Sequence, residues 1–302
     1  MKLKGVVPAI GTPLADGDTV DEAGLRRLTR YLLHSRVHGI LANGSMGGFA
    51  FLTDEEQIRA ISIIVSEVKG TVPVVATLGE TGTIRAVRKA KQIAREGVNA
   101  LCVLPPYYFL TSQEHLISYF SEIAAAVDLP VMLYDNPTLT KVLIKPATVA
   151  ELRRRIPNLV GIKVSNQDCN NLQEVLHLVG GDPSFSVLTG SESLFLVSLR
   201  MGADGGIGGL YTICPHQAVA LYEAFSSGEN RRAQEMQREL INVWQIFRYG
   251  NIWGGFDEAL RYLEICHRAT GGPYVTTLTE EDAASVRTIL DQYVRPYLSP
   301  RV

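Results

Sequence analysis

The sequence predicts an α/β fold, a (β/α)8 TIM barrel followed by a C-terminal helical extension. Short apolar runs alternate with longer amphipathic stretches over about two-thirds of the 302 residues. Several runs are continuous in Val, Ile and Leu, which is typical of parallel strands covered on both faces. Eight strand–helix units without a break in composition favour a closed barrel. An open doubly wound sheet is the alternative, but no Gly-x-Gly-x-x-Gly turn follows the first strand.

The predicted strands are short and are spread regularly along the chain. Helical patterns separate them, and three of these begin at a capping residue, namely Thr53, Ser112 or Asp168. We therefore expect the barrel to occupy residues 1–227. The predicted strands cover residues 6–12, 40–43, 72–78, 100–104, 131–134, 160–163, 186–189 and 205–208.

Beyond Gly228 the pattern changes to helices alone. Helical periodicity covers residues 229–249, 255–269 and 279–294, with a turn signal at Gly271-Gly272-Pro273. No long linker or low-complexity segment separates this part from the barrel. We expect residues 228–302 to form a helical appendix packed on the barrel, without a separate function.

Composition and charge exclude several classes of protein. A formal charge of −2 with 46% hydrophobic and 20% charged residues gives no sign of nucleic-acid binding or attraction to anionic membranes. No apolar run is long enough to span a bilayer, and the N-terminus lacks a signal-peptide core. The four cysteines are scattered, as in a protein with reduced thiols. We expect a cytoplasmic protein with no nucleic-acid or membrane partner.

Lys163 is the residue whose position most clearly suggests covalent chemistry. It closes the apolar run 159–163, and barrel enzymes place their chemistry at the carboxyl ends of such strands. Burial disfavours the charged form of an amine and so supplies the neutral nucleophile that forms a Schiff base with a carbonyl. The alternative is an ordinary lysine at the end of a strand, whose ammonium group extends into water.

Other strand ends offer partners for such a lysine. Tyr134 ends the fifth strand and could move a proton. The turn Gly44-Ser45-Met46 follows the second strand and could bind a carboxylate through backbone N–H groups and the Ser45 hydroxyl. No histidine falls at a strand end, so we expect neither a metal site nor a catalytic triad. A pyridoxal phosphate enzyme would need a phosphate cradle that is not found, and we expect no cofactor.

Four motifs in this order carry a family resemblance: the glycine-rich turn after strand two, Pro105-Pro106-Tyr107-Tyr108, Leu-Tyr-x-x-Pro around Tyr134, and Gly161-Ile162-Lys163. From about Lys4 to Tyr211 the chain resembles the dihydrodipicolinate synthase/N-acetylneuraminate lyase family. The resemblance implies a class I aldolase-type barrel whose lysine forms a Schiff base with pyruvate or another 2-oxo acid. It also implies a homotetramer built as a dimer of dimers.

The resemblance assigns roles residue by residue. Lys163 matches the Schiff-base lysine, and Tyr134 matches the proton-transferring tyrosine. Ser45 matches the hydroxyl residue that relays protons to that tyrosine, and Tyr108 matches a tyrosine that completes the relay of a neighbouring subunit. Ile207 matches the apolar residue that packs near the pyruvyl group.

Three departures from the family pattern bear on the substrate. The turn reads Ser45-Met46-Gly47-Gly48, where the family has two hydroxyl residues followed by Gly-Glu. Leu139 stands where the synthases carry an arginine that holds the second substrate's carboxylate, and Leu139 also occurs in 2-keto-3-deoxy sugar acid aldolases. Glu192 followed by Ser193 is half of the acidic pair with which the sialic acid lyases bind sugar hydroxyls.

These features predict a carbon–carbon lyase that cleaves or forms a 2-oxo-3-deoxy sugar acid from pyruvate and an aldehyde. The resemblance lies closer to the sugar-acid branches than to dihydrodipicolinate synthase itself. A dihydrodipicolinate synthase, an N-acetylneuraminate lyase, and a Schiff-base dehydratase or deaminase remain alternatives. A catalytically silent homologue that only binds a ligand is a further one, because the turn is altered; Lys163 and Tyr134 together argue against it.

Overall fold

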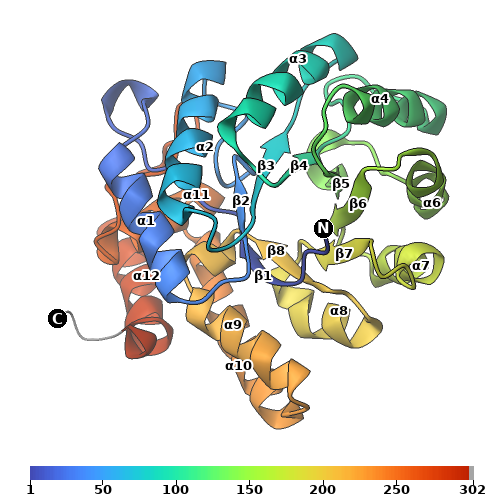
Figure 1. Ribbon diagram of the computed structural model, residues 1–302. Helices are drawn as coiled ribbons and strands as arrows, with labels where there is room; N and C mark the ends of the chain where they lie inside the picture. The colour runs from blue at the N-terminus through green and yellow to red at the C-terminus, as the bar shows by residue number, and fades with distance from the viewer. Residues whose placement is uncertain (299–302) are drawn as a thin grey trace.

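Eight parallel strands form a barrel at the centre of the computed structural model, which describes residues 1–298 (Figure 1). The fold prediction is confirmed, and each predicted strand coincides with an observed one to within a few residues. The strands are β1 Gly5–Pro8, β2 Ile40–Ala42, β3 Val74–Leu78, β4 Ala100–Val103, β5 Val131–Asp135, β6 Leu159–Val164, β7 Ser186–Thr189 and β8 Gly205–Gly208.

The barrel closes through a short contact between its first two strands. Hydrogen-bonded neighbours follow the order β1-β8-β7-β6-β5-β4-β3-β2. β1 and β2 lie at the two ends of this order. A parallel bridge between Ala9 and Leu41 joins them, and Ile10 N donates to Leu41 O at 3.1 Å. Because every strand runs in the same direction, all eight carboxyl ends meet on one face.

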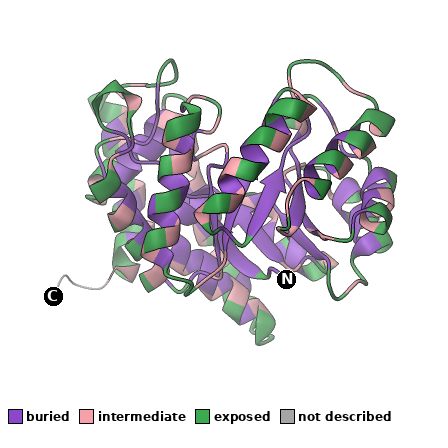
Figure 2. Cartoon of the chain, turned by 45° about the horizontal axis from the view of Figure 1, so that its top comes forward, coloured by how far each residue is buried: buried purple, intermediate pink, exposed green. Residues whose placement is uncertain are grey.

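Helices surround the strands and bury them on their outer side. Figure 2 shows that the strands are almost entirely buried, while the helices bury one face and expose the other. The three predicted caps are confirmed: Thr53 accepts from Glu56 N, Ser112 from His115 N, and Asp168 from Asn170 N. The barrel helices are α1 Glu22–His34, α2 Asp54–Val68, α3 Thr83–Ile93, α4 Gln113–Ala125, α6 Pro146–Arg155, α7 Cys169–Val179, α8 Phe195–Met201 and α9 Pro215–Ser226, with the short α5 Pro137–Thr140 after β5.

Three longer helices follow the barrel: α10 Asn230–Trp244, α11 Ile252–Tyr262 and α12 Glu280–Tyr293. α10 packs along α9, and α12 contacts both α10 and α11. The predicted helix over 255–269 is wrong at both ends. It begins earlier because Asn251 caps Trp253 N and Gly254 N, and it ends at Tyr262, shortly before Glu264 adopts a left-handed conformation with φ 56°. Among the helices of residues 1–298, none combines the length and apolar character needed to cross a bilayer.

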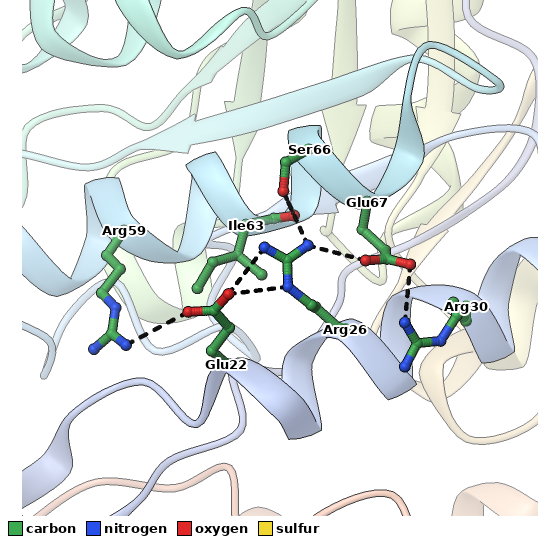
Figure 3. A network of polar contacts seen from close by, with 7 residues as sticks. All are labelled: Glu22, Arg26, Arg30, Arg59, Ile63, Ser66 and Glu67. Carbon is green, nitrogen blue, oxygen red and sulfur yellow. Dashed lines mark hydrogen bonds and ion pairs between the residues drawn. The ribbon is translucent and has the colours of Figure 1, made fainter.

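Charged side chains link α1 and α2 on the outside of the barrel (Figure 3). Arg26 contacts Glu22 and Glu67, each at 2.9 Å, and Arg30 contacts Glu67 at 3.1 Å. These side chains are partly exposed, so solvent screens each pair and each contributes little to stability. The network joins two outer helices of the barrel.

We predict that Gly205→Ala strongly destabilises the barrel. Gly205 pairs with Gly5 where β8 meets β1, and a Cβ at this position would lie 2.1 Å from Gly5 O. Backbone atoms cannot yield as a flexible side chain can, so the free energy of unfolding should fall by about 2 kcal/mol or more. Urea unfolding followed by circular dichroism measures this loss.

Gly181→Ala is the matched control, because a Cβ there meets no atom within 4 Å. Its unfolding midpoint should stay close to that of the wild type. Equal midpoints for the two variants would contradict the close packing of β1 against β8.

Candidate active site

Lys163 and Tyr134 lie side by side on neighbouring strands. They are register partners in the pairing of β5 with β6, and the Lys163 Nζ lies 4.0 Å from the centre of the Tyr134 ring. Lys163 is 4% exposed and Tyr134 is 2% exposed. The two side chains whose proximity the proposed chemistry needs therefore meet inside the barrel, near the carboxyl ends of their strands.

The Tyr134 hydroxyl is the centre of a small polar cluster. The Ser45 Oγ lies 3.4 Å from the Tyr134 Oη, and the Asn136 Nδ2 donates to the Oη at 3.3 Å. Burial raises the pKa of the Tyr134 phenol, but the Lys163 ammonium and hydrogen bonds with Lys163, Ser45 and Asn136 together lower it below its ordinary value. A phenol held in this way can both give and take a proton.

The turn after β2 is held from two sides. The Thr12 hydroxyl donates to Gly47 O at 2.7 Å. Gln57 of α2 donates to Phe49 O at 2.9 Å and to Leu52 O at 3.0 Å. Within the turn, the amides of Gly47 and Gly48 donate to Gly44 O and Ser45 O. These contacts fix Ser45 beside Tyr134.

The buried ion pair of Lys89 with Glu80 holds Gln57 in place. The Lys89 Nζ lies 2.7 Å from both Glu80 Oε1 and Asp54 Oδ1, and it donates to the Gln57 Oε1 at 3.3 Å. Burial disfavours the Lys89 ammonium, yet the two carboxylates raise its pKa and keep it charged. Sequence reasoning missed this brace, since nothing in the spacing of Asp54, Glu80 and Lys89 shows that they meet.

A cavity of ≈ 250 Å³ opens above Lys163. Most of the predicted site residues line it: Ser45, Met46, Tyr134, Leu139, Lys163, Glu192 and Ile207. Gly44, in the turn after β2, is buried and does not line the cavity. The cavity is also lined by residues that were not predicted, and these come from two parts of the chain. Asn136, Ser165 and Gln167 follow β5 and β6, whereas Trp244, Phe247 and Ile252 come from the C-terminal helices.

Glu192 begins the 3-10 helix Glu192–Leu194 in the segment after β7 and is half-buried. Its Oε1 accepts a hydrogen bond from Leu210 N at 3.0 Å. Burial raises the pKa of the Glu192 carboxyl, although this backbone N–H opposes the effect. Gln237 of α10 donates to Glu192 O at 3.0 Å and accepts from Leu196 N at 2.8 Å. The helical extension thus holds the loop that carries Glu192.

Leu139 lies at the mouth of the cavity on α5 and is 59% exposed. The segment that follows it is anchored by Asp135, whose Oδ1 accepts from Ile144 N at 3.0 Å. Burial raises the pKa of the Asp135 carboxyl to about 7. The leucine places no hydrogen-bonding or charged group at the entrance.

Tyr108 is a predicted site residue that lies at the surface, away from the cavity. Its side chain is 85% exposed, its φ is 89°, and its ring contacts that of Phe109. It does not line the cavity above Lys163. Within residues 1–298, no cluster of three or more His, Cys, Asp or Glu side chains could hold a metal ion.

The fold and the Lys163–Tyr134 pair define a class: the class I pyruvate-dependent aldolases and lyases, whose lysine forms a Schiff base with a 2-oxo acid. The chain belongs to the dihydrodipicolinate synthetase family, which matches residues 2–293. It is 35% identical over 241 residues to a 4-hydroxy-tetrahydrodipicolinate synthase of Methanopyrus kandleri, with 80% of each chain covered. It is 30% identical over 292 residues to an uncharacterized DapA-like lyase of Thermofilum pendens, with 96% of each covered.

Solved structures agree with this membership. The chain superposes on YagE of E. coli K12, a dihydrodipicolinic acid synthase family protein crystallised with pyruvate, with a TM-score of 0.91 and 28% identity over 96% of this chain and 98% of YagE. A dihydrodipicolinate synthase from Thermotoga maritima gives a TM-score of 0.92 and 26% identity over 97% and 99%. Several named relatives are synthases, so any closer relation to the sugar-acid branches depends on the site residues themselves.

We predict that Ser45→Ala raises the pKa of the Tyr134 phenol. The Ser45 hydroxyl stabilises the phenolate, so its removal should move the tyrosinate titration to higher pH. An ultraviolet difference titration against Tyr134→Phe isolates this phenol from the other tyrosines.

Ser193→Ala serves as the control, because the Ser193 hydroxyl contacts Ser191 rather than Tyr134. Its titration curve should match that of the wild type. An unshifted curve for Ser45→Ala would show that Ser45 does not share a proton with Tyr134.

Proposed function

We propose that this protein is a class I aldolase that cleaves a 2-oxo-3-deoxy sugar acid to pyruvate and an aldehyde, or forms it in reverse. The observation that carries the proposal is the burial of Lys163 against Tyr134 at the floor of a cavity on the catalytic face. Ionisable pairs held in this way cluster at functional sites. The covalent chemistry is supplied by the lysine itself.

The reaction follows from the positions of the two side chains. The Lys163 amine adds to the C2 carbonyl and loses water, which leaves a protonated imine that draws electrons from the C3–C4 bond. Tyr134 takes the proton of the C4 hydroxyl as that bond breaks, and the aldehyde leaves. The resulting enamine takes a proton at C3, and water releases pyruvate from Lys163. Ser45 and Asn136 contact the Tyr134 hydroxyl and so support both proton transfers.

The turn after β2 is the proposed seat of the substrate carboxylate. Ser45 and Met46 line the cavity, and the preceding Gly44 is buried. Backbone N–H groups of Ser45 and Met46 with the Ser45 hydroxyl would bind the carboxylate. Met46 replaces a hydroxyl residue of the family pattern, but its amide does not depend on the side chain.

The second substrate is inferred from the rest of the lining. Leu139 offers no cation for a second carboxylate, which disfavours the synthase reaction suggested by several relatives' names. Ser165, Gln167 and Glu192 offer hydroxyl, amide and carboxylate groups that suit sugar hydroxyls. Ile207 is fully buried and would pack against the pyruvyl group.

We also propose a homotetramer, a dimer of dimers, in which Tyr108 of one subunit completes the relay of the next. Tyr108, Phe109 and Leu110 form a tip with exposures of 85%, 76% and 79%. A recess of ≈ 320 Å³ beside Ser45, lined by aromatic residues including Phe49, would receive such a tip.

The proposed reaction predicts that Lys163→Ala abolishes pyruvate release from 2-oxo-3-deoxy sugar acids while the fold remains intact. Tyr134→Phe should lower kcat by about a hundredfold or more, since it retains the ring but loses the proton carrier. A coupled lactate dehydrogenase assay measures both, and circular dichroism checks folding.

Activity that survives in Lys163→Ala would refute the Schiff-base mechanism. Pyruvate consumption with an aldehyde bearing a second carboxylate would favour the synthase alternative. Loss of water or ammonia without pyruvate release would instead indicate a dehydratase or deaminase. A folded wild type that turns over none of these would favour the silent homologue.

The oligomer proposal predicts that Tyr108→Phe keeps the assembly but lowers kcat by roughly tenfold or more, because only the hydroxyl is lost. Sedimentation and turnover measure the two effects separately. Phe109→Leu, one residue along the same tip, should leave kcat unchanged at equal assembly. A wild-type kcat in Tyr108→Phe would remove this tyrosine from the relay.

A further inference from the structure

The wall formed by the C-terminal helices indicates which sugar acid the cavity takes. Resting on the proposed function, we infer that the aldehyde half of the substrate is uncharged and ends in a methyl group, and that Trp244, Phe247 and Ile252 select it. Such a substrate is a 2-oxo-3,6-dideoxy acid. Three observations lead to this inference: the charges of the lining, its polar edge, and its apolar end.

The lining leaves no partner for a distal anion. Among the described residues around the cavity, Lys163 and Glu192 are the charged ones. Lys163 is consumed by the Schiff base, and Glu192 would repel a phosphate or second carboxylate. A buried anion without a cationic partner is strongly disfavoured. Arg248 lies 6.0 Å from the Trp244 ring but does not line the cavity, so the test below includes it.

Polar side chains line the part of the cavity that follows the barrel strands. Ser165 and Gln167 follow β6, and Glu192 follows β7, so all three lie on the same side as Lys163. Their hydroxyl, amide and carboxylate groups can pair with hydroxyls on the carbons next to the bond that breaks. Within residues 1–298, the C-terminal helices add no hydroxyl, carboxamide or carboxylate group to the lining, whose further polar residues Asn136 and Thr138 follow β5.

The apolar end consists of three side chains from the extension. Trp244 ends α10, Phe247 belongs to the 3-10 helix Gln245–Arg248, and Ile252 begins α11. The Trp244 and Phe247 rings meet edge to face with centroids 6.1 Å apart, and Phe247 stacks on the buried Phe256 at 6.4 Å. The rings are fixed by packing, and the three side chains offer no hydrogen-bond acceptor. A terminal hydroxyl placed against them would find no acceptor, whereas a terminal methyl would gain apolar contacts.

The chemistry balances for such a substrate. A six-carbon 2-oxo-3,6-dideoxy acid loses its C3–C4 bond, the C4 hydroxyl proton passes to Tyr134, and C3 takes a proton from the same tyrosine. The products are pyruvate and a three-carbon 2-hydroxyaldehyde that keeps the terminal methyl. No oxidant, reductant or further reactant is required.

The test compares three acids of equal configuration at C4 and C5: one with a terminal methyl, one with a terminal hydroxymethyl, and the 6-phosphate of the latter. We expect kcat/KM for the methyl acid to exceed that of the hydroxymethyl acid by about tenfold or more. The phosphate should be cleaved most slowly. Ile252→Thr and Trp244→Gln should each reduce the methyl preference, mainly through KM for the methyl acid.

Ile241→Thr is the matched control, because Ile241 is a partly exposed residue of α10 outside the cavity lining. It should keep the wild-type preference. Trapping of pyruvate by borohydride should be unchanged in all three variants, since the pyruvyl end of the site is intact. If a variant loses the preference for the methyl acid but still traps pyruvate, the apolar end selects the substrate and the fold is undamaged.

Two outcomes overturn the inference in different ways. Equal or greater activity on the hydroxymethyl acid, or a phosphate preference that Arg248→Ala removes, contradicts it while the proposed aldolase function stands. Trapping of pyruvate on Lys163 without cleavage of any of the three acids refutes the proposed function, and the inference falls with it.

Discussion

The register between β5 and β6 sets the chemistry of this barrel. It pairs Tyr134 with Lys163 and places the amine 4.0 Å from the centre of the phenol ring. The register shifts by one residue between Val131 and Met132, so that Met132 pairs with Gly161 and Tyr134 with Lys163. The distance therefore depends on the pairing of two strands rather than on a flexible loop. Against the opposing effect of burial, the Lys163 ammonium lowers the pKa of the Tyr134 phenol, and a phenol that exchanges its proton readily is what the proposed Schiff-base chemistry requires.

The surrounding structure holds the residues around Lys163 and Tyr134 in place. Gln57 holds the turn that brings Ser45 to the Tyr134 hydroxyl, and Lys89 with its carboxylates holds Gln57. On the opposite side, Gln237 of α10 holds the loop that carries Glu192. The extension after the barrel is therefore part of the site: it positions one polar residue and supplies the apolar end of the cavity.

The barrel and the positions of its central site residues could be predicted from the sequence. Continuous apolar runs mark strands buried on both faces, and so the positions of Lys163 and Tyr134 followed from where those runs end. Trp244 and Phe247 could not be found in this way, because their approach to the site depends on how α10 packs along α9. The helix predicted over 255–269 failed since periodicity does not show the left-handed residue Glu264. Tyr108 is 85% exposed in the single chain, and its proposed role depends on a second subunit, which no single-chain pattern describes.

The most direct test of the central claim is the exchange of the pyruvate methyl protons in D2O, followed by proton NMR. It needs no knowledge of the aldehyde, because the Schiff base on Lys163 and proton transfer by Tyr134 suffice to form and reprotonate the enamine. The account predicts rapid exchange with the wild type, much slower exchange with Tyr134→Phe, and only the uncatalysed rate with Lys163→Ala. Catalysed exchange that persists in Lys163→Ala, or none with the folded wild type, would contradict it.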